Sequence, residues 1–475
     1  MTTFARSLSQ SGSYQGNVVI KILGQWFTIR TPDSGLDVLA CYDGLVQSLT
    51  LSPTQVDIRR VSSTIATYGL RMIDRDLAIS NLVQGNAALL LDTDVEVYIG
   101  QSNAEMDFAD YYQLPTTRIT KVDYTDGTYN FATTEQTDRI NRAIFAQTTR
   151  LLNDIVAGTT EILSDSDLSD FPSSGYLKID NEFMSYSGIN YAQNRFTGVV
   201  RGEYYSTPAA HSSGADVYLT QVITGNPIDI ILKVLVSNGG GGTWDALQDG
   251  CGISPSLIDL DGILALRDVE FPNVQFQVFL YNVSNALKFL ESDLLTPLNL
   301  RFSVSNASKL TLRQLDRLAV RESDTIIDDD TIREPPKWMV DVNKVVNYVV
   351  IEWDYDEPTK AYKKRSAYTD ADSIARYGKS DPFALKFKCV RTALEGQTLV
   401  DDFAQKLLGR ISQPNPEVTL ATHLDKLLLG PGERVEVDTT RVPALDGSLN
   451  FASEMEIVSR SINYLTGDVQ FKLCF

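Results

Sequence analysis

The sequence predicts a mainly β protein with an α+β region in its middle. Three observations lead to this fold class. Short runs of alternating apolar and polar residues, separated by turn residues, fill the first part of the chain. Helical periodicity appears only after residue 226, and the alternating pattern returns near the C-terminus. We therefore expect β, α+β and β regions in that order.

Composition limits the class of protein further. The chain has 475 residues, of which 43% are hydrophobic and 22% charged, so it is long enough for several folded domains. Its formal net charge of −19 argues against a surface that holds nucleic acid by neutralising phosphates. No apolar run is long enough to cross a bilayer, and residues 1–17 lack the apolar core of a signal peptide. We expect synthesis in the cytosol, and we treat the glycosylation patterns at Asn282 and Asn306 as chance.

Residues 1–135 are predicted to form a first β-barrel or sandwich. The run 18–23 is apolar on both faces, whereas 95–99 alternates between apolar and polar residues. A hairpin over 118–131 is indicated by Asp126-Gly127, because both residues tolerate a positive φ. Residues 136–160 are expected to be a linker.

A small inserted β module is predicted over residues 161–220. Apolar and aromatic residues alternate over 176–186 on both sides of Asp180-Asn181, which predicts a hairpin. The strand-ending sequence Val-Val-Arg-Gly over 199–202 follows, and after it Thr-Pro-Ala-Ala-His-Ser-Ser-Gly-Ala-Asp-Val over 207–217.

An α+β connector domain is predicted over residues 221–335. Pro227 is suited to the first position of a helix, and Asn238-Gly239 is placed to end it. A second helix is expected over 284–295, followed by a strand pair over 298–304 and 309–312. The run Gly239 to Gly242 lacks the Lys-Ser/Thr of a phosphate-binding loop, so it is interpreted as a flexible connector.

Residues 336–475 are predicted to form a second β-barrel that contains one helix. Charge and proline content place a domain boundary over 328–336, and a long strand is expected over 343–356. The helix is expected over 398–411, with Thr398 and Asp401 as a capping box. It is followed by two prolines that prevent its continuation, and the last strand, 469–475, is expected to hold the C-terminus in a sheet.

The sequence offers no convincing catalytic, cofactor or metal site. His211 and His423 have no carboxylate or cysteine at ligand spacing, and His211 is interpreted as a turn residue that bonds to backbone. The acidic residues of 165–170 lack the ligand ladder of a calcium loop, so we interpret them as a solvated loop. The basic run 360–365 is expected to be an exposed hairpin end or an interface patch. Four dispersed cysteines are expected to be buried thiols: Cys41, Cys251, Cys389 and Cys474.

Several segments, taken in order, resemble the baseplate hub or tail-tip family of long-tailed phages. Apart from residues 199–217, whose pattern recurs in phage tail proteins, the segments are 227–231, 251–253, 257–259, 343–348, 353–356, 373–378 and 429–435. Unlike some relatives, this chain has no counterpart of an appended cell-wall hydrolase or of a cysteine-ligated iron–sulfur cluster.

The resemblance implies a structural, non-enzymatic virion protein without a cofactor. It implies two barrels of the tail-tube fold, 1–135 and 336–475, that flank the connector. A homotrimer would present these barrels as a pseudo-sixfold ring that continues the tail tube and lets genomic DNA pass. The implied partners are the tail tube, distal tail and tape measure proteins and central fibre or receptor-binding proteins, at the tail tip of a virion assembled in the host cytoplasm.

Two other functions stay open from the sequence. The β module and 21 tyrosines permit a receptor- or carbohydrate-binding module that recognises a host-surface glycan. A glycan-cleaving enzyme needs a pair of carboxylates, and none of the 61 acidic residues is singled out as a member of such a pair. Under the hub interpretation, the net charge predicts an acidic lumen that does not hold DNA.

Overall fold

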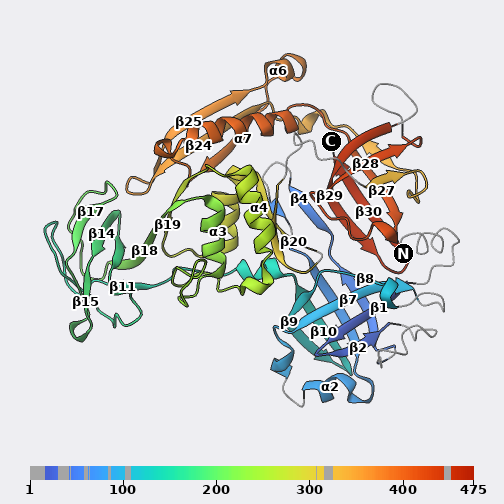
Figure 1. Ribbon diagram of the computed structural model, residues 1–475, viewed down its shortest axis with the longest axis horizontal. Helices are drawn as coiled ribbons and strands as arrows, with labels where there is room; N and C mark the ends of the chain where they lie inside the picture. The colour runs from blue at the N-terminus through green and yellow to red at the C-terminus, as the bar shows by residue number, and fades with distance from the viewer. Residues whose placement is uncertain are drawn as a thin grey trace. The chain divides into compact units, whose positions relative to one another are not determined.

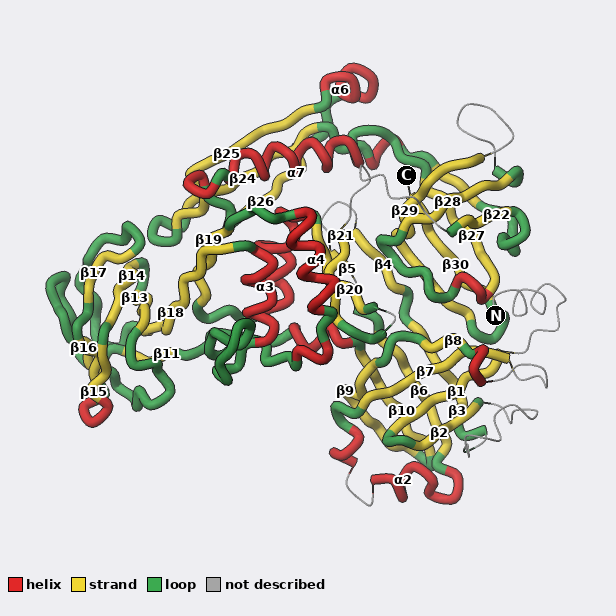
Figure 2. Tube along the Cα trace, viewed as in Figure 1, coloured by secondary structure: helices red, strands yellow, loops and turns green. Residues whose placement is uncertain are grey.

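The computed structural model describes residues 16–29, 42, 44–57, 62–63, 65–83, 87–101, 108–305, 307–314, 325–442 and 451–474 (Figures 1 and 2). The chain divides into two compact units, each built from segments far apart in sequence. Unit 1 comprises Met1–Asp138, Leu300–Val345 and Gly409–Phe475, and unit 2 comprises Arg139–Asn299 and Val346–Leu408. The fold is mainly β, as predicted, with 43% strand and 22% helix.

The first sheet of unit 1 has eight strands from the N-terminal part of the chain. Its order is β2-β1-β7-β9-β10-β6-β3, with β8 paired to β7. The strands are β1 (Gly16–Ile22), β2 (Gln25–Thr28), β3 (Val46–Leu51), β6 (Thr67–Ile73), β7 (Asp94–Gln101), β8 (Tyr112–Gln113), β9 (Thr117–Thr125) and β10 (Thr128–Thr134). A short helix, α2 (Ala78–Val83), follows β6.

Two local predictions for this sheet are confirmed. Strand β1 is buried on both faces over most of its length, although Leu23, expected to continue it, lies exposed in the turn that follows. Asp126 and Gly127 join β9 to β10 with φ of +49° and +72°, which are the backbone angles that this residue pair tolerates best.

The second sheet of unit 1 also has eight strands, and it draws on three parts of the chain. Its order is β22-β28-β29-β30-β27-β23, while β4 pairs with β29 and β5 with β4. The strands are β4 (Thr54–Asp57), β5 (Ser62–Ser63), β22 (Ile326–Asp328), β23 (Lys337–Met339), β27 (Glu417–His423), β28 (Arg434–Thr439), β29 (Phe451–Asn463) and β30 (Asp468–Cys474). The predicted domain boundary at 328–336 therefore has a strand of this sheet on either side.

One apolar core serves both sheets of unit 1. Residues of β1, β7 and β10 belong to the same buried cluster as residues of β27, β28 and β30. The first strand also approaches the second sheet directly: a Cβ added to Gly16 would lie 1.8 Å from the Tyr464 carbonyl oxygen. The Tyr464 hydroxyl accepts a hydrogen bond from the Leu49 backbone N–H at 3.3 Å. These contacts make the two sheets parts of a single body.

In unit 2, the inserted module forms two small sheets. The larger has the order β11-β18-β13-β14-β17, with β19 paired to β18, and the smaller has the order β12-β16-β15. The strands are β11 (Thr148–Arg150), β12 (Ile162–Leu163), β13 (Gly175–Ile179), β14 (Glu182–Tyr186), β15 (Gly188–Asn190), β16 (Arg195–Thr197), β17 (Val200–Glu203), β18 (Asp216–Gly225) and β19 (Phe276–Leu280).

The hairpin predicted at Asp180-Asn181 is present as β13 and β14, and Asp180 takes a φ of +51°. Strand β11 lies within 136–160, the segment predicted as a linker. It was not anticipated because three residues carry too little periodicity to be recognised.

Helices and the third sheet of unit 2 follow the module. Helix α3 (Pro227–Val236) begins where predicted, and the Asn226 side chain accepts from the Ile228 N–H at 3.0 Å.

The second predicted helix is α5 (Ala286–Phe289), continued by a π-helical segment, Leu290–Leu295. Helix α4 (Leu260–Glu270) was not predicted, because among its side chains only Ile263 is buried and no apolar stripe marks it. The predicted strand pair is β20 (Leu300–Val304) and β21 (Leu310–Gln314), which belong to unit 1.

A three-stranded sheet with the order β25-β24-β26 completes unit 2. Its strands are β24 (Tyr348–Asp356), β25 (Ala361–Thr369) and β26 (Phe383–Phe387), and α6 (Ala371–Tyr377) precedes β26. Helix α7 (Gly396–Ile411) packs on it through an edge-to-face contact between Phe387 and Phe403, with ring centroids 5.0 Å apart. The predicted capping box is wrong, because α7 begins two residues before Thr398. The strand predicted from residue 343 begins at Tyr348, after a short 3₁₀ turn.

Candidate functional site

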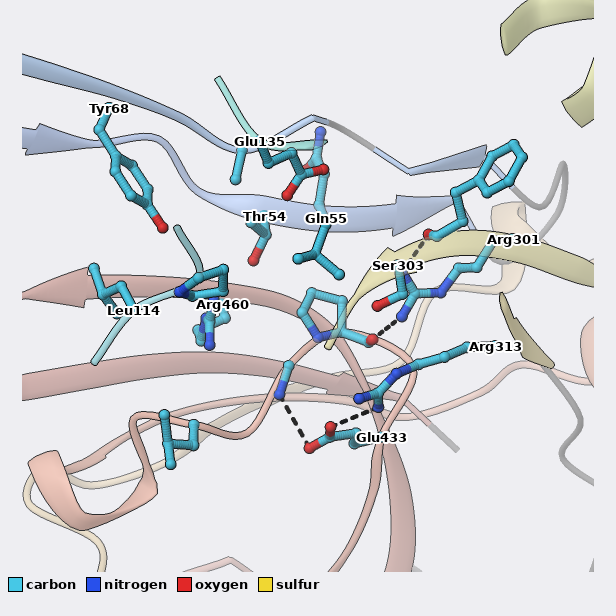
Figure 3. A pocket seen from close by; sticks show the side chains of 17 residues that line it. Thr54, Gln55, Tyr68, Leu114, Glu135, Arg301, Ser303, Arg313, Glu433 and Arg460 are labelled. Atoms are coloured by element: carbon cyan, nitrogen blue, oxygen red, sulfur yellow. Dashed lines mark hydrogen bonds and ion pairs between the residues drawn. The ribbon is translucent and has the colours of Figure 1, made fainter. Parts of the chain in front are cut away.

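A polar cavity of about 70 Å³ lies inside unit 1 where its three chain segments meet. Figure 3 shows its lining, in which charged side chains come from the residue after β10, from the β20–β21 hairpin, from the loop before β28 and from β29. The groups that dominate its electrostatics are Tyr68, Glu135, Arg301, Arg313, Glu433 and Arg460. Because these residues are up to several hundred positions apart, no sequence motif marks them.

The arginines of the cavity bind protein acceptors. Arg313 Nη1 lies 2.5 Å from Glu433 Oε1, and Arg301 donates to the Pro431 carbonyl oxygen (Figure 3). Arg460 donates from Nη1 to the carbonyl oxygens of Leu427 and Leu429, at 2.9 and 3.1 Å. Each arginine thus ties the hairpin or β29 to the loop that precedes β28.

Burial sets the ionisation of the cavity. It lowers the pKa of Arg301 to about 10, with Arg313 adding to the effect, so the guanidinium still carries its charge at neutral pH. Burial also raises the pKa of Glu135 to about 7, although hydrogen bonds from Thr137 and the nearby arginines act in the opposite direction. Glu135 is therefore the group in this cavity whose charge changes near neutral pH.

The polar groups that line the cavity hold separate parts of unit 1 together. Its lining contains no histidine and no cysteine, and the arginines are engaged by carbonyl or carboxylate oxygens. Arg301 Nε and Thr54 Oγ1 have no hydrogen-bond partner among the residues that the structure describes. The cavity has room for water that would complete their bonding.

A second polar cluster lies in the inserted module, and the sequence did not reveal it. Arg201 donates from Nε and Nη2 to the two carboxylate oxygens of Glu182, at 2.6 and 2.7 Å. His211 Nε2 lies 2.9 Å from Glu182 Oε2, and its Nδ1 lies 2.7 Å from Asp180 Oδ2. The Ala209 N–H also donates to Glu182 Oε2 at 2.9 Å. The cluster thus links the β13–β14 turn to β17 and to the loop before β18.

The expectation for His211 is partly wrong. Its backbone does pair with Ile155, through two bonds of 3.0 and 2.9 Å, but its ring bonds to carboxylates instead of backbone. The missed signal is the Asp180-x-Glu182 spacing, which brings two carboxylates to the start of one strand. Burial acts to raise the pKa of Glu182, but the bonds from Arg201, Ala209 and His211 outweigh it and the pKa is lowered. An ionised, fully bonded carboxylate of this kind holds a loop in place.

The other residues that the sequence brought forward are dispersed. Cys251, Cys389 and Cys474 are buried, as expected, while Cys41 and Phe475 lie outside the described residues. His423 is buried on β27.

The acidic loop is held by local bonds. Asp165 accepts from the Arg150 N–H at 3.3 Å, and Asp167 accepts from the Ser169 hydroxyl at 2.7 Å. Over the described ranges, no group of three or more histidine, cysteine or acidic side chains is placed to hold a metal ion.

The basic run 360–365 forms the end of a hairpin, as predicted. Lys360 closes the turn between β24 and β25 with a φ of +54°, and Lys363 pairs with Asp356 at 2.7 Å. The Gly239–Gly242 run is an irregular loop after α3. Among the helices in the described part of the chain, none has the length and apolar character needed to span a membrane.

Comparison with known proteins gives matches in structure alone. No family model matches the sequence, and no curated protein matches it. A tail protein from Neisseria meningitidis is similar over 97% of both chains, with 8% identity and a TM-score of 0.44. A 43 kDa prophage tail protein from Shewanella oneidensis is similar over 97% of this chain and 98% of its own, with 10% identity and a TM-score of 0.43. A prophage tail protein from Listeria monocytogenes is similar over 96% and 94%, with 9% identity and a TM-score of 0.40.

All three are tail proteins, the class that the sequence resemblance indicated.

Proposed function

We propose that this chain is a structural protein of a phage tail and that it forms the hub of the tail tip or baseplate. The observation that carries the proposal is that the two ends of the chain build two eight-stranded sheets within one unit. A hub of this kind needs two sheet domains per subunit with a fixed relation to each other.

The joint between the sheets supports this role. Strand β4, from the N-terminal part of the chain, pairs with β29 of the second sheet, through Thr54 opposite Arg460. The shared apolar core and the arginine-rich cavity add to this connection. Sheets connected in this way move as one body, and their relation is the same in every copy of the chain.

A fixed relation between the two sheets would allow the symmetry of a hub to match that of the tail tube. Three copies of a subunit with two tube-like domains present six similar edges, so a homotrimer can continue a sixfold tail tube. The neighbours of such a ring are the tube, distal tail and tape measure proteins and a central fibre or receptor-binding protein. The net charge of the chain is −19, and we propose that the lumen of the ring is acidic as well. An acidic lumen makes no strong contacts with the phosphates of passing DNA.

The mass of the purified chain in solution tests the proposal. Light scattering should give three times the chain mass of 52.7 kDa. The trimer should then form a ring with purified tail tube protein in electron micrographs. A monomer at micromolar concentration that also fails to associate with the tube protein would refute the hub assignment. A trimer whose lumen is lined with Arg and Lys would refute only the proposed DNA path.

The alternative of a receptor- or glycan-binding protein predicts something different. A protein that acts only as a binding module would neither form a trimer nor associate with the tube protein. In the two clusters described above, Arg201, Arg301 and Arg460 are bound to a carboxylate or to backbone carbonyl oxygens, which suits a structural role. We accordingly assign the chain a structural role in the virion tail.

A further inference from the structure

A groove of about 510 Å³ in unit 2 has a lining unlike that of the cavity in unit 1. Aromatic side chains reach it from three elements: Tyr204 and Tyr205 follow β17, Phe279 lies on β19 and Tyr355 on β24. Acidic, amide, ammonium and guanidinium groups also line the groove, at Asp354, Asp356, Glu357, Gln277, Lys363 and Arg391. Neither polar cluster described above is part of it.

Tyr205 is the most unusual residue of the groove. Its side chain is 97% exposed, and Tyr204 and Tyr205 are adjacent residues with φ of +50° and +62°. Left-handed backbone at two consecutive tyrosines is costly, and such strain is concentrated at functional positions. An exposed aromatic ring on a strained turn is poorly explained by folding stability.

The turn that carries Tyr205 is firmly held. Ser206 is buried, and its hydroxyl accepts from the Phe183 N–H at 2.9 Å and donates to the Glu203 carbonyl oxygen at 2.7 Å. The ring of Tyr204 packs edge-to-face on Phe279, with centroids 5.2 Å apart. The residues on either side of Tyr205 are thus held in place by these contacts.

A buried cation lies in the wall of the groove. Arg391 is only 8% exposed, its guanidinium lies 5.7 Å from the centre of the Phe279 ring, and it donates to the Tyr355 carbonyl oxygen. Its Nε has no hydrogen-bond partner among the residues that the structure describes. A buried donor without a partner is rare, and it points to a polar ligand or water at this place.

The acidic groups of the groove are held in fixed positions. Asp354 accepts from the Thr392 hydroxyl through Oδ2 at 2.6 Å, and Asp356 accepts from the Thr359 hydroxyl at 2.5 Å. Three carboxylates stand against two cations in the lining. Lys388 also pairs with Glu357 at 2.8 Å, so these charges balance and offer no net attraction to polyanions such as nucleic acid or sulfated glycans. An apolar peptide would bury these carboxylates without new hydrogen bonds, at a considerable cost.

We propose that this groove binds a neutral oligosaccharide. The hydroxyls of a sugar match the fixed carboxylates and the Arg391 guanidinium, and its C–H face matches the exposed ring of Tyr205, which gives contact area at little loss of side-chain entropy. Several copies of such a site in one assembly would bind a multivalent glycan more tightly than a single copy does. The proposal does not depend on the assignment as a hub.

Titration of the full-length chain with defined compounds tests the proposal. The neutral probes are maltohexaose, chitotetraose and a β-galactose tetrasaccharide, and the others are a heparin hexasaccharide and a proline-rich decapeptide. Saturation-transfer NMR and calorimetry should show saturable binding of at least one neutral probe. Tyr205→Ala should weaken it by at least 5-fold without lowering the melting temperature, and Asp354→Asn should weaken it as well.

Tyr191→Ala is the matched control, because Tyr191 is a tyrosine of the same module that is 48% exposed and does not line the groove. It should change the affinity by less than 2-fold. The proposal is overturned if no neutral probe binds, if Tyr205→Ala binds like wild type, or if only the heparin fragment or the peptide binds. None of these results bears on the trimer measurement, so the two proposals fail separately.

Discussion

Arg201 and Glu182 form a two-point ion pair in the interior of the inserted module, with Nε–Oε1 and Nη2–Oε2 distances of 2.6 and 2.7 Å. The side chains are 6% and 1% exposed, so water cannot replace either partner in these hydrogen bonds. The pair connects β14 to β17, and Arg201 Nη2 also donates to the Ala209 carbonyl oxygen at 2.6 Å. Loss of one partner leaves a buried charge without compensation.

Arg201→Ala should therefore destabilise the module strongly. Removing one member of a buried pair costs about 3–5 kcal/mol, because the buried Glu182 carboxylate loses its two bonds from the guanidinium and keeps only those from His211 and the backbone. Urea unfolding of the full chain, followed by tyrosine fluorescence, should show the module melting earlier. The control is Arg195→Ala, whose ion pair with Glu161 has side chains that are 29% and 50% exposed and is expected to contribute about 0–1 kcal/mol. Equal effects of the two variants would contradict the assigned role of Glu182.

Glu135→Gln should alter the pH dependence of stability. The pKa of Glu135 is raised from 4.5 to about 7 in the folded chain, so the folded state binds a proton that the unfolded state has lost between these values. The free energy of unfolding should therefore fall as pH rises from about 5 to about 7 and then level off. In the variant, the free energy of unfolding does not fall in this way. The difference in free energy of unfolding, variant minus wild type, should therefore rise by roughly 2–3 kcal/mol between pH 5 and pH 8.

Urea titrations at four pH values measure this difference. The charged and ionisable groups around Glu135 are Arg301, Arg460 and Tyr68, and they are unchanged in the variant. Glu454→Gln, at a half-exposed surface position, should leave the wild-type pH dependence as it is. Identical pH profiles for wild type and Glu135→Gln would show that Glu135 does not titrate in this range.

Gly16→Ala should weaken the joint between the sheets of unit 1. The added Cβ would lie 1.8 Å from the Tyr464 carbonyl oxygen and 3.0 Å from the Leu465 Cα, both of which are backbone atoms that cannot rotate away. We expect a loss of about 1–3 kcal/mol or more, visible as a lower melting temperature. Gly69→Ala is the control, because its Cβ would meet the Thr50 side chain at an ordinary 3.6 Å. That variant should be neutral or slightly more stable, since alanine replaces glycine within a strand.

Asn226→Ala should remove the N-cap of α3. The Asn226 side chain accepts from the Ile228 N–H at 3.0 Å and donates to the Phe271 carbonyl oxygen at 2.7 Å. Loss of an N-cap costs about 0.5–2 kcal/mol. Asn226→Ser keeps the acceptor but lacks the donor to Phe271, so it should restore part of the stability in thermal unfolding followed by circular dichroism. No difference between Ala and Ser would show that the cap contributes nothing.

The local elements were predictable because their causes lie within a few residues. The Asp126-Gly127 hairpin follows from backbone angles that only certain residues tolerate, and α3 follows from a capping residue, a proline and an apolar run. The start of α7 was predicted two residues late, because the side-chain pattern of Thr398 and Asp401 imitates a capping box inside the helix. Helix α4 was not predicted, because only one of its side chains is buried.

The sequence by itself determined the class of fold, the positions of most strands and helices, and the resemblance to tail proteins. The tertiary structure alone decided which strands share a sheet and which charges meet. Strand β4 joins β29 about 400 residues later, and Arg301 reaches the Pro431 carbonyl oxygen across 130 positions. The physical reason is that hydrogen bonds and ion pairs depend on distance in space, whereas periodicity and turn chemistry report only on neighbours in sequence. The sites proposed here are therefore properties of the folded chain.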